Sequence, residues 1–332
     1  MQATKSRSTS RPLLSDDSLT TITLVVSFVI ICVLFASQSE NFLTLNNFET
    51  ISKQLAVVGV VAIGMTMVLI TGGVDISVGS VAALAGVVTG VLWVEVGVPL
   101  VLSVVAGITS GVLIGFLNGF MITVLKINPL ITTLATFSIV RGLAFVLSQG
   151  RSNQINNDPF KFIGRGEVFG VSFSLLVMLA LYGMFFYVLR HTQFGRNLFA
   201  IGGSPEASRL AGINVTRHLL ITYTICGFLA AVSGIIITSQ LAQSAPRAAT
   251  GLEFTVITAV ILGGTSLMGG KGTLMGTLIG VIILRTLSNG LTVNEVSSFY
   301  QEVVSGAALI FAVGFDQLRI RLSRAVAARG SE

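Results

Sequence analysis

The chain has 332 residues, of which 52% are hydrophobic and 10% are charged, and its mean hydropathy is +0.88. A soluble domain carries about 25% charged residues, so this composition excludes a sizeable soluble domain and predicts an all-α polytopic membrane protein. The formal net charge of +6 reflects basic residues placed beside membrane segments and does not indicate nucleic-acid binding.

Ten apolar segments are candidate membrane spans, since a spanning helix needs roughly 20 mostly apolar residues. They lie at about 19–36, 54–71, 77–95, 99–125, 130–148, 171–189, 217–240, 253–268, 273–290 and 299–317. The two between 253 and 290 are short and interrupted by glycine, so the expected number is eight to ten. No small-residue cleavage site follows the first apolar run, which we therefore expect to be retained.

Ten spans place both termini on one side of the membrane, and the distribution of Lys and Arg identifies that side as the cytoplasm. With this topology, 13 of the 20 Lys and Arg residues are cytoplasmic. They are Lys5, Arg7, Arg11, Lys126, Arg190, Arg196, Arg209, Arg217, Lys271, Arg319, Arg321, Arg324 and Arg329. We expect cytoplasmic tails at 1–18 and 318–332, a transmembrane domain at 19–317, and one long, polar outside loop at 149–170.

Asp75 lies where the second span gives way to the third, in TGGVDISVGS. An ionisable residue at membrane depth indicates function by default, and the glycines around it indicate broken backbone inside protein or beside water. Asp75 and Ser77 are therefore candidates for a translocation path or gate, and capping of the next helix by Asp75 is the alternative. Asn118, Asn128 and Asn289 lie near span ends, where each can donate to a sugar hydroxyl or cap a helix.

Two segments of the sequence show a weak internal similarity. They are GGVDISVGSVAALAG, from Gly72 to Gly86, and GGTSLMGGKGTLMGT, from Gly263 to Thr277. Both have a double glycine and a further glycine seven residues after the first. Duplicated halves are common in transporters, and a chance likeness between two glycine-rich segments explains the similarity equally well.

The fourth predicted span carries Gly107, Gly111, Gly115 and Gly119, one every four residues. This spacing lays a glycine stripe along one helix face and allows another backbone to approach closely. Tight helix packing is the simple interpretation, and a hinge or pore-facing role is the alternative.

Residues 190–217, RHTQFGRNLFAIGGSPEASRLAGINVTR, form a basic segment between two apolar ones, as a short cytoplasmic loop should. Within it, PEASRLAG predicts a short helix with Pro205 in its first turn and Gly212 as its terminator. A helix of this kind at the membrane surface is well placed to be gripped by a partner.

The glycines before Lys271 do not form a phosphate-binding loop. That motif needs a glycine where Thr265 stands and a Ser or Thr where Gly272 stands. We therefore expect no nucleotide cradle in this chain.

We also expect no catalytic or metal site and no cofactor bound by the chain, which should not be an enzyme. Cys32 and Cys226 fall in apolar runs and suit packing. His191 and His218 flank the basic segment, where interface polarity explains them better than metal binding does.

SPEASRLAG resembles the EAA-type loop of ATP-binding-cassette (ABC) importer permeases. Four longer segments, at 64–80, 127–142, 195–214 and 259–280, resemble the ribose/xylose/galactose-type permeases in the same order along the chain. The resemblance extends from about residue 20 to 317 and is specific to the family, though not to the sugar. It implies that the domain at 19–317 is a permease domain and that 190–217 is its cytoplasmic coupling loop.

The resemblance implies the membrane-spanning half of a bacterial sugar importer, a multi-pass protein of the inner membrane that works by alternating access. Its expected partners are a cytoplasmic ABC ATPase that carries ATP and Mg²⁺, a periplasmic or extracellular sugar-binding protein, a second permease copy (the same or different) and membrane lipid. The residues expected to couple to the ATPase are Gly203, Ser204, Pro205, Glu206, Ala207, Ser208, Arg209 and Gly212. Among them, Glu206 and Arg209 are candidates for charged contacts.

The alternative is a stand-alone ion-coupled secondary transporter or a channel. That class needs carboxylates buried within the spans. Asp75 is the main candidate, with Glu253 and Glu302 marginal, so the sequence favours the importer.

Overall fold

The computed structural model describes residues 16–304, 306–311 and 313–314, and these form a helical bundle. The helices are α1 (Asp16–Gln38), α2 (Leu45–Ile70), α3 (Val78–Gly90), α4 (Leu100–Thr123), α5 (Pro129–Leu147), α6 (Asp158–Arg165), α7 (Phe173–His191), α8 (Gln193–Gly203), α9 (Pro205–Leu210), α10 (Val215–Leu241), α11 (Leu252–Leu262) and α12 (Leu274–Val293). A π-helical turn, Val91–Glu95, extends α3. Residues 298–304 are also helical, as are 306–311 and 313–314.

Seven helices in the described part of the chain are long and apolar enough to cross a membrane. They are α2, α3 with its π-helical turn, α4, α5, α7, α10 and α12. Each corresponds to a span predicted from the sequence, so the polytopic all-α class is confirmed. Helix α1 covers the expected first span, and the described residues of the expected last span, 299–304, 306–311 and 313–314, are helical. Apart from residues 16–18, which begin α1, the two expected tails lie outside the described residues.

The predicted span at 253–268 is wrong in its length, because α11 has only 11 residues. At about 1.5 Å per residue it is roughly half as long as the hydrocarbon core is thick. It ends early because Gly264 takes a left-handed φ of +89°. The amide of Gly264 then donates to the Ile261 carbonyl and that of Thr265 to the Val260 carbonyl, as in a Schellman cap.

Helix α2 ends in the same way, with Gly72 at a φ of +81°. The amides of Gly72 and Gly73 donate to the carbonyls of Leu69 and Val68. By backbone geometry, Gly72 therefore corresponds to Gly264. The sequence similarity between the two segments instead matched Gly72 with Gly263, one position earlier. The two breaks share a backbone conformation, and the duplication itself stays a hypothesis.

Helices α2 and α10 form the centre of the bundle. Within its apolar window 78% of α2 is buried inside the chain, against 22% of α4, whose other faces are open. The glycine stripe of α4 faces α3 at Gly107 and α10 from Gly111 to Gly119: a Cβ on Gly115 would lie 3.1 Å from the Gly227 Cα, and one on Gly119 would lie 2.9 Å from the Leu220 Cα. The predicted close helix packing is therefore confirmed.

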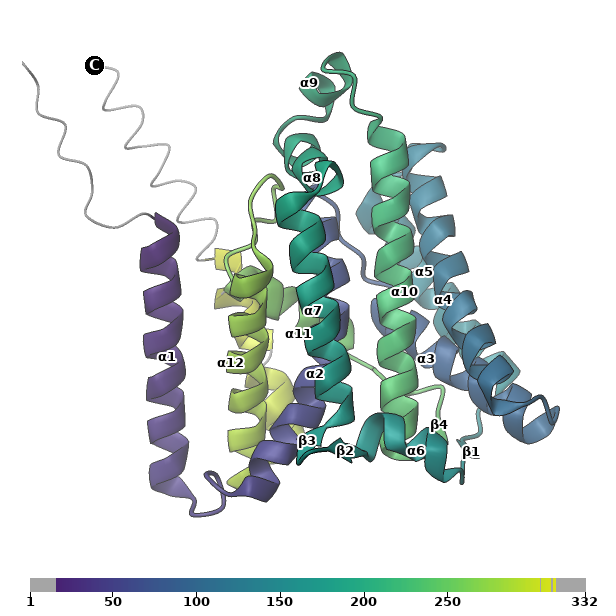
Figure 1. The fold of residues 1–332 in the computed structure, drawn as a ribbon, viewed down its shortest axis with the longest axis vertical. Helices are drawn as coiled ribbons and strands as arrows, with labels where there is room; N and C mark the ends of the chain where they lie inside the picture. Colours follow the sequence, from purple (N-terminus) through teal and green to yellow (C-terminus); the bar gives the residue numbers. More distant parts are fainter. Residues whose placement is uncertain (1–15, 305, 312, 315–332) are drawn as a thin grey trace, which may run out of the picture.

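The two ends of the bundle differ (Figure 1). At one end α8 and α9 project beyond the other helices, and at the opposite end α6 and the short strands lie across the helix ends. There β1 (Asn153–Gln154) pairs antiparallel with β4 (Gln243–Ser244), and β2 (Glu167–Val168) pairs with β3 (Val171–Ser172). The polar loop predicted at 149–170 thus contains α6 and is tied by β1 to the connection between α10 and α11.

Candidate functional site

Helix α9 is the most protruding element of the described chain (Figure 1). The Ser204 hydroxyl caps it by accepting from the Ala207 amide at 3.2 Å, and Pro205 occupies its first turn. Gly212, at a φ of +82°, follows its end. The predicted cap positions are therefore observed. Gly203, which we expected among the coupling residues, ends α8 and does not belong to α9.

The surface of α9 combines charge with one apolar side chain. Glu206 and Arg209 are exposed, and neither forms an ion pair within the described residues. Leu210 is 92% exposed. The sequence analysis missed Leu210, although an apolar residue at the tip of a polar helix is a recognisable signal of a partner.

Helix α8 is fixed firmly beneath α9. Its Leu198 and Ile201 side chains are fully buried. The His218 ring, on α10, stacks on Phe194 with centroids 5.4 Å apart and lies 3.0 Å from the Asn197 amide nitrogen. His218 thus joins α8 to α10.

A groove lies between the α9–α10 end and the turn from α4 to α5. Its lining includes Lys126, Asn128, Arg209 and Thr216. Asn128 caps α5 there, because its side-chain oxygen accepts from the amides of Leu130 at 2.9 Å and Ile131 at 3.4 Å. Capping is thus the role that the geometry supports for Asn128.

Three of the predicted path residues meet in one buried chain of hydrogen bonds. The Ser77 hydroxyl donates to Asp75 Oδ1 at 2.6 Å, and the Ser77 amide donates to the same oxygen at 2.9 Å. The Asn118 amide donates to the Ser77 hydroxyl at 3.0 Å, and Thr136 donates to Asn118 Oδ1 at 2.7 Å. All four side chains are buried. This series of hydrogen bonds therefore links the α2–α3 connection to α4 and α5. Its donors point towards the carboxyl group of Asp75.

Thr136 was not predicted from the sequence, although it shares one face of α5 with Thr132 and Thr133, and all three are buried. Their spacing in an otherwise apolar helix is the signal that could have identified them.

Asn289 lies elsewhere, in α12. It forms a reciprocal amide pair with Asn47 of α2, with hydrogen bonds of 2.8 and 2.9 Å. Both side chains are buried. This pair ties two helices together and does not extend the chain from Asp75.

A second polar cluster joins α5 to the loop before α11. Arg141 Nη1 donates to the carbonyl oxygens of Pro246 and Ala248, each at 2.8 Å. Glu253 is buried against the backbone of Gly79, and its Oε2 atom has no hydrogen-bond partner within the described residues. The Arg141 guanidinium group therefore ties α5 to the backbone of this loop.

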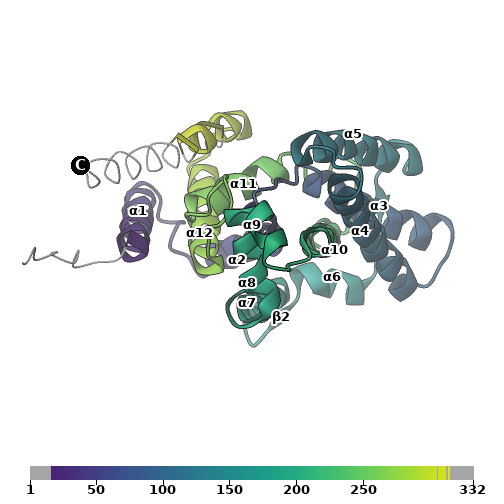
Figure 2. The ribbon, with the colours of Figure 1, turned by 90° about the horizontal axis from the view of Figure 1, so that it is seen from above.

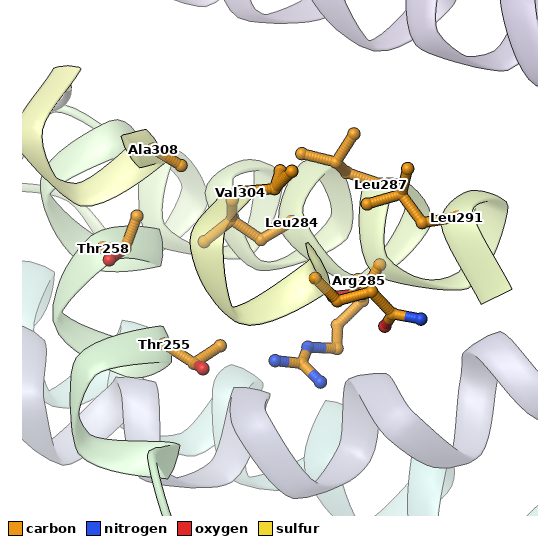
Figure 3. Close-up of a pocket in the computed structure, with 10 residues that line it drawn as sticks. Thr255, Thr258, Leu284, Arg285, Leu287, Leu291, Val304 and Ala308 are labelled. Atoms are coloured by element: carbon orange, nitrogen blue, oxygen red, sulfur yellow. The ribbon is translucent and has the colours of Figure 1, made fainter. Parts of the chain in front are cut away.

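A narrow pocket lies between α11, α12 and the helical residues from 298 to 311 (Figure 3). The Arg285 side chain extends across it towards Thr255, and the Arg285 Nε atom has no hydrogen-bond partner among the described residues. Across the described part of the chain, no group of His, Cys, Asp and Glu side chains could hold a metal ion.

The chain has known relatives along most of its length. Residues 47–313 match the family described as "Branched-chain amino acid transport system / permease component". The ribose import permease protein RbsC of Bacillus subtilis is 41% identical over 290 residues, which cover 87% of this chain and 90% of that protein. The L-arabinose transport system permease protein AraH of Escherichia coli is 40% identical over 303 residues, which cover 91% and 92%. No solved structure matches the chain.

Proposed function

The chain belongs to the transport-system permease family that residues 47–313 match, and from this premise we propose that it is the membrane-spanning subunit of an ABC importer. Its cargo is a monosaccharide or a related sugar-like molecule. The observation that carries this proposal is the likeness to ribose and arabinose permeases over about nine-tenths of each chain.

The importer is a multi-pass protein of the bacterial inner membrane, with ten passes and both termini in the cytoplasm. In support, successive helices alternate in direction, and Lys126, Arg190, Arg196, Arg217 and Lys271 lie in segments that face the α9 end. Short basic loops stay on the cytoplasmic side. Helix α11 is too short to cross the membrane alone, so α11 and the loop that precedes it together form one of the ten passes.

The cytoplasmic partner is an ABC ATPase that binds ATP and Mg²⁺ and grips α9. Residues Ser204–Gly212 then act as a coupling lever, in which Glu206 and Arg209 make charged contacts and Leu210 enters an apolar groove. The exposure of all three side chains supports this assignment. A sugar-binding protein docks at the opposite end, and a second permease copy completes the path.

The buried hydrogen-bond series stabilises the wall of the translocation path at the α2–α3 connection. It consists of Asp75, Ser77, Asn118 and Thr136. It is buried and fully bonded within one subunit, so it supports a gating role rather than direct contact with a sugar. Alternating access then moves this connection relative to α4 and α5.

The proposal is tested by reconstituting the chain in liposomes with its ATPase and binding protein and offering a panel of radiolabelled monosaccharides. Uptake of one sugar should require ATP and both partners. The alternative function, a stand-alone ion-coupled transporter or channel, is tested with the chain alone under a proton or sodium gradient. Uptake in that second experiment would overturn the importer assignment.

A further inference from the structure

Three segments that are distant in sequence meet through their backbones beneath α9. They are the end of α2 at Ile70–Gly73, the end of α8 at Gly202, and Gly269–Gly270 in the connection between α11 and α12. The Gly270 amide donates to the Ile70 carbonyl at 2.8 Å. We call these residues the glycine junction. Seen from the α9 end, α8 and α9 lie between α12 and α10, above α2 (Figure 2).

At two positions of the junction, Gly202 and Gly269, the backbone contacts leave no room for a side chain. A Cβ on Gly202 would collide with the Ile70 carbonyl oxygen and the Gly270 amide. A Cβ on Gly269 would lie 2.9 Å from the Gly202 carbonyl oxygen and 2.9 Å from the Gly72 amide. Gly269 and Gly270 also have left-handed φ angles of +83° and +72°. Backbone in direct contact has no rotamers through which to absorb a displacement, so the junction is stiff.

The glycine junction lies next to two places where a membrane segment is interrupted, one after α2 and one after α11. Gly72 and Gly73 precede Asp75, where the buried series of hydrogen bonds to α4 and α5 begins. Gly73 also lies under the Tyr223 hydroxyl of α10, where a Cβ would not fit. On the other side, Gly269 and Gly270 belong to the loop that follows the short α11.

The other attachment of α9 is more open. It runs through Gly212, which has a φ of +82°, and a Cβ placed on this glycine would have no atom within 4 Å. Asn214 then caps α10 by accepting from the Arg217 amide at 3.0 Å. A displacement of α9 can be absorbed in this turn, whereas Gly202 abuts Ile70 directly.

We propose that the glycine junction transmits the displacement of α9 to both membrane breaks, with Gly202 as the positioning residue that sets the contact. This inference rests on the proposed function, because it assumes that an ATPase moves α9. The displacement of α9 passes to the end of α8 and from there into the α2–α3 and α11–α12 connections. The α2–α3 connection then transmits it to α4 and α5.

The test compares Gly202→Ala with Gly183→Ala in the complete importer, reconstituted with its ATPase and binding protein. Both glycines are helical and alanine favours helix at each, but a Cβ on Gly183, in α7, has no atom within 4 Å. Sugar uptake per ATP hydrolysed should fall about tenfold in Gly202→Ala, the size of a typical coupling term, and stay unchanged in Gly183→Ala. ATPase co-purification should be normal in both.

A pair of insertions provides a second test that adds no atom to the junction. Two glycines between Gly203 and Ser204 should lower uptake per ATP, because they loosen α9 from α8. The same insertion between Ile213 and Asn214 should leave that ratio near the unaltered value.

Equal ratios in both substitutions and in both insertions would overturn the inference. A wild-type complex without ATP-dependent uptake would instead refute the proposed function itself.

Discussion

At the scale of single residues, the hydrogen-bond chain around Ser77 should be sensitive to substitution. Its hydroxyl donates to Asp75 and accepts from Asn118, so it serves two buried partners at once. A buried polar group that loses its partner costs more than the bond itself contributes, since water cannot replace the partner.

Ser77→Ala should therefore lower the free energy of unfolding by about 1–3 kcal/mol and reduce uptake. Thermal unfolding of the detergent-purified protein measures the first effect, and transport by the reconstituted importer measures the second. Ser110→Ala is the control, because the Ser110 hydroxyl bonds to the Gly107 carbonyl of its own helix. Equal stability of the two variants would contradict the assigned role.

The Asn47–Asn289 pair should act on stability alone. In a double-mutant cycle with Asn47→Ala and Asn289→Ala, we expect a coupling energy of about 0.5–3 kcal/mol, because the two amides bond to each other. Uptake per folded molecule should stay unchanged in Asn289→Ala. The exposed neighbour, in Asn46→Ala, is the matched control. A selective loss of uptake in Asn289→Ala would return that residue to the translocation path.

At the scale of elements, the contact between α4 and α10 depends on glycine. Gly115→Ala places a methyl group against Gly227 and the Tyr223 carbonyl, and overpacking of this kind costs about 1–3 kcal/mol. Gly183→Ala, on α7, meets no atom within 4 Å and should be neutral or slightly stabilising. Melting temperatures in detergent compare the two, and similar values would argue against close helix contact.

The sequence predicted ten spans, and seven of these correspond to helices long and apolar enough to cross a membrane. It also predicted the cap positions of α9 and the close packing face of α4. Each of these features depends on a local pattern of apolar, proline or glycine residues. The sequence overestimated α11, since hydropathy continues through Gly263 while the backbone turns at Gly264. It could not predict that Asp75, Ser77 and Asn118 meet, nor that Gly202 contacts Ile70. Such contacts depend on how distant helices pack, and one sequence carries no direct record of that packing.

At the scale of the whole molecule, the two ends of the bundle should have different partners. Leu210→Asp should abolish co-purification of the ATPase, because it places a charge where an apolar side chain is 92% exposed on α9. Glu206→Arg should weaken the same contact by reversing its charge. Phe169→Asp, in the fully exposed turn between β2 and β3 at the opposite end, is the control and should retain the ATPase. Retention by Leu210→Asp as well would place the ATPase contact elsewhere.

The exposed tip of α9 has a further consequence for the cell. With the topology and the ATPase partner proposed above, a subunit made in excess of its partner presents Leu210 to the cytoplasm, and uncovered apolar surface attracts chaperones and proteases. The steady-state amount of this protein should therefore follow the supply of its ATPase. The same leucine that completes the assembled machine would mark the orphaned subunit for removal.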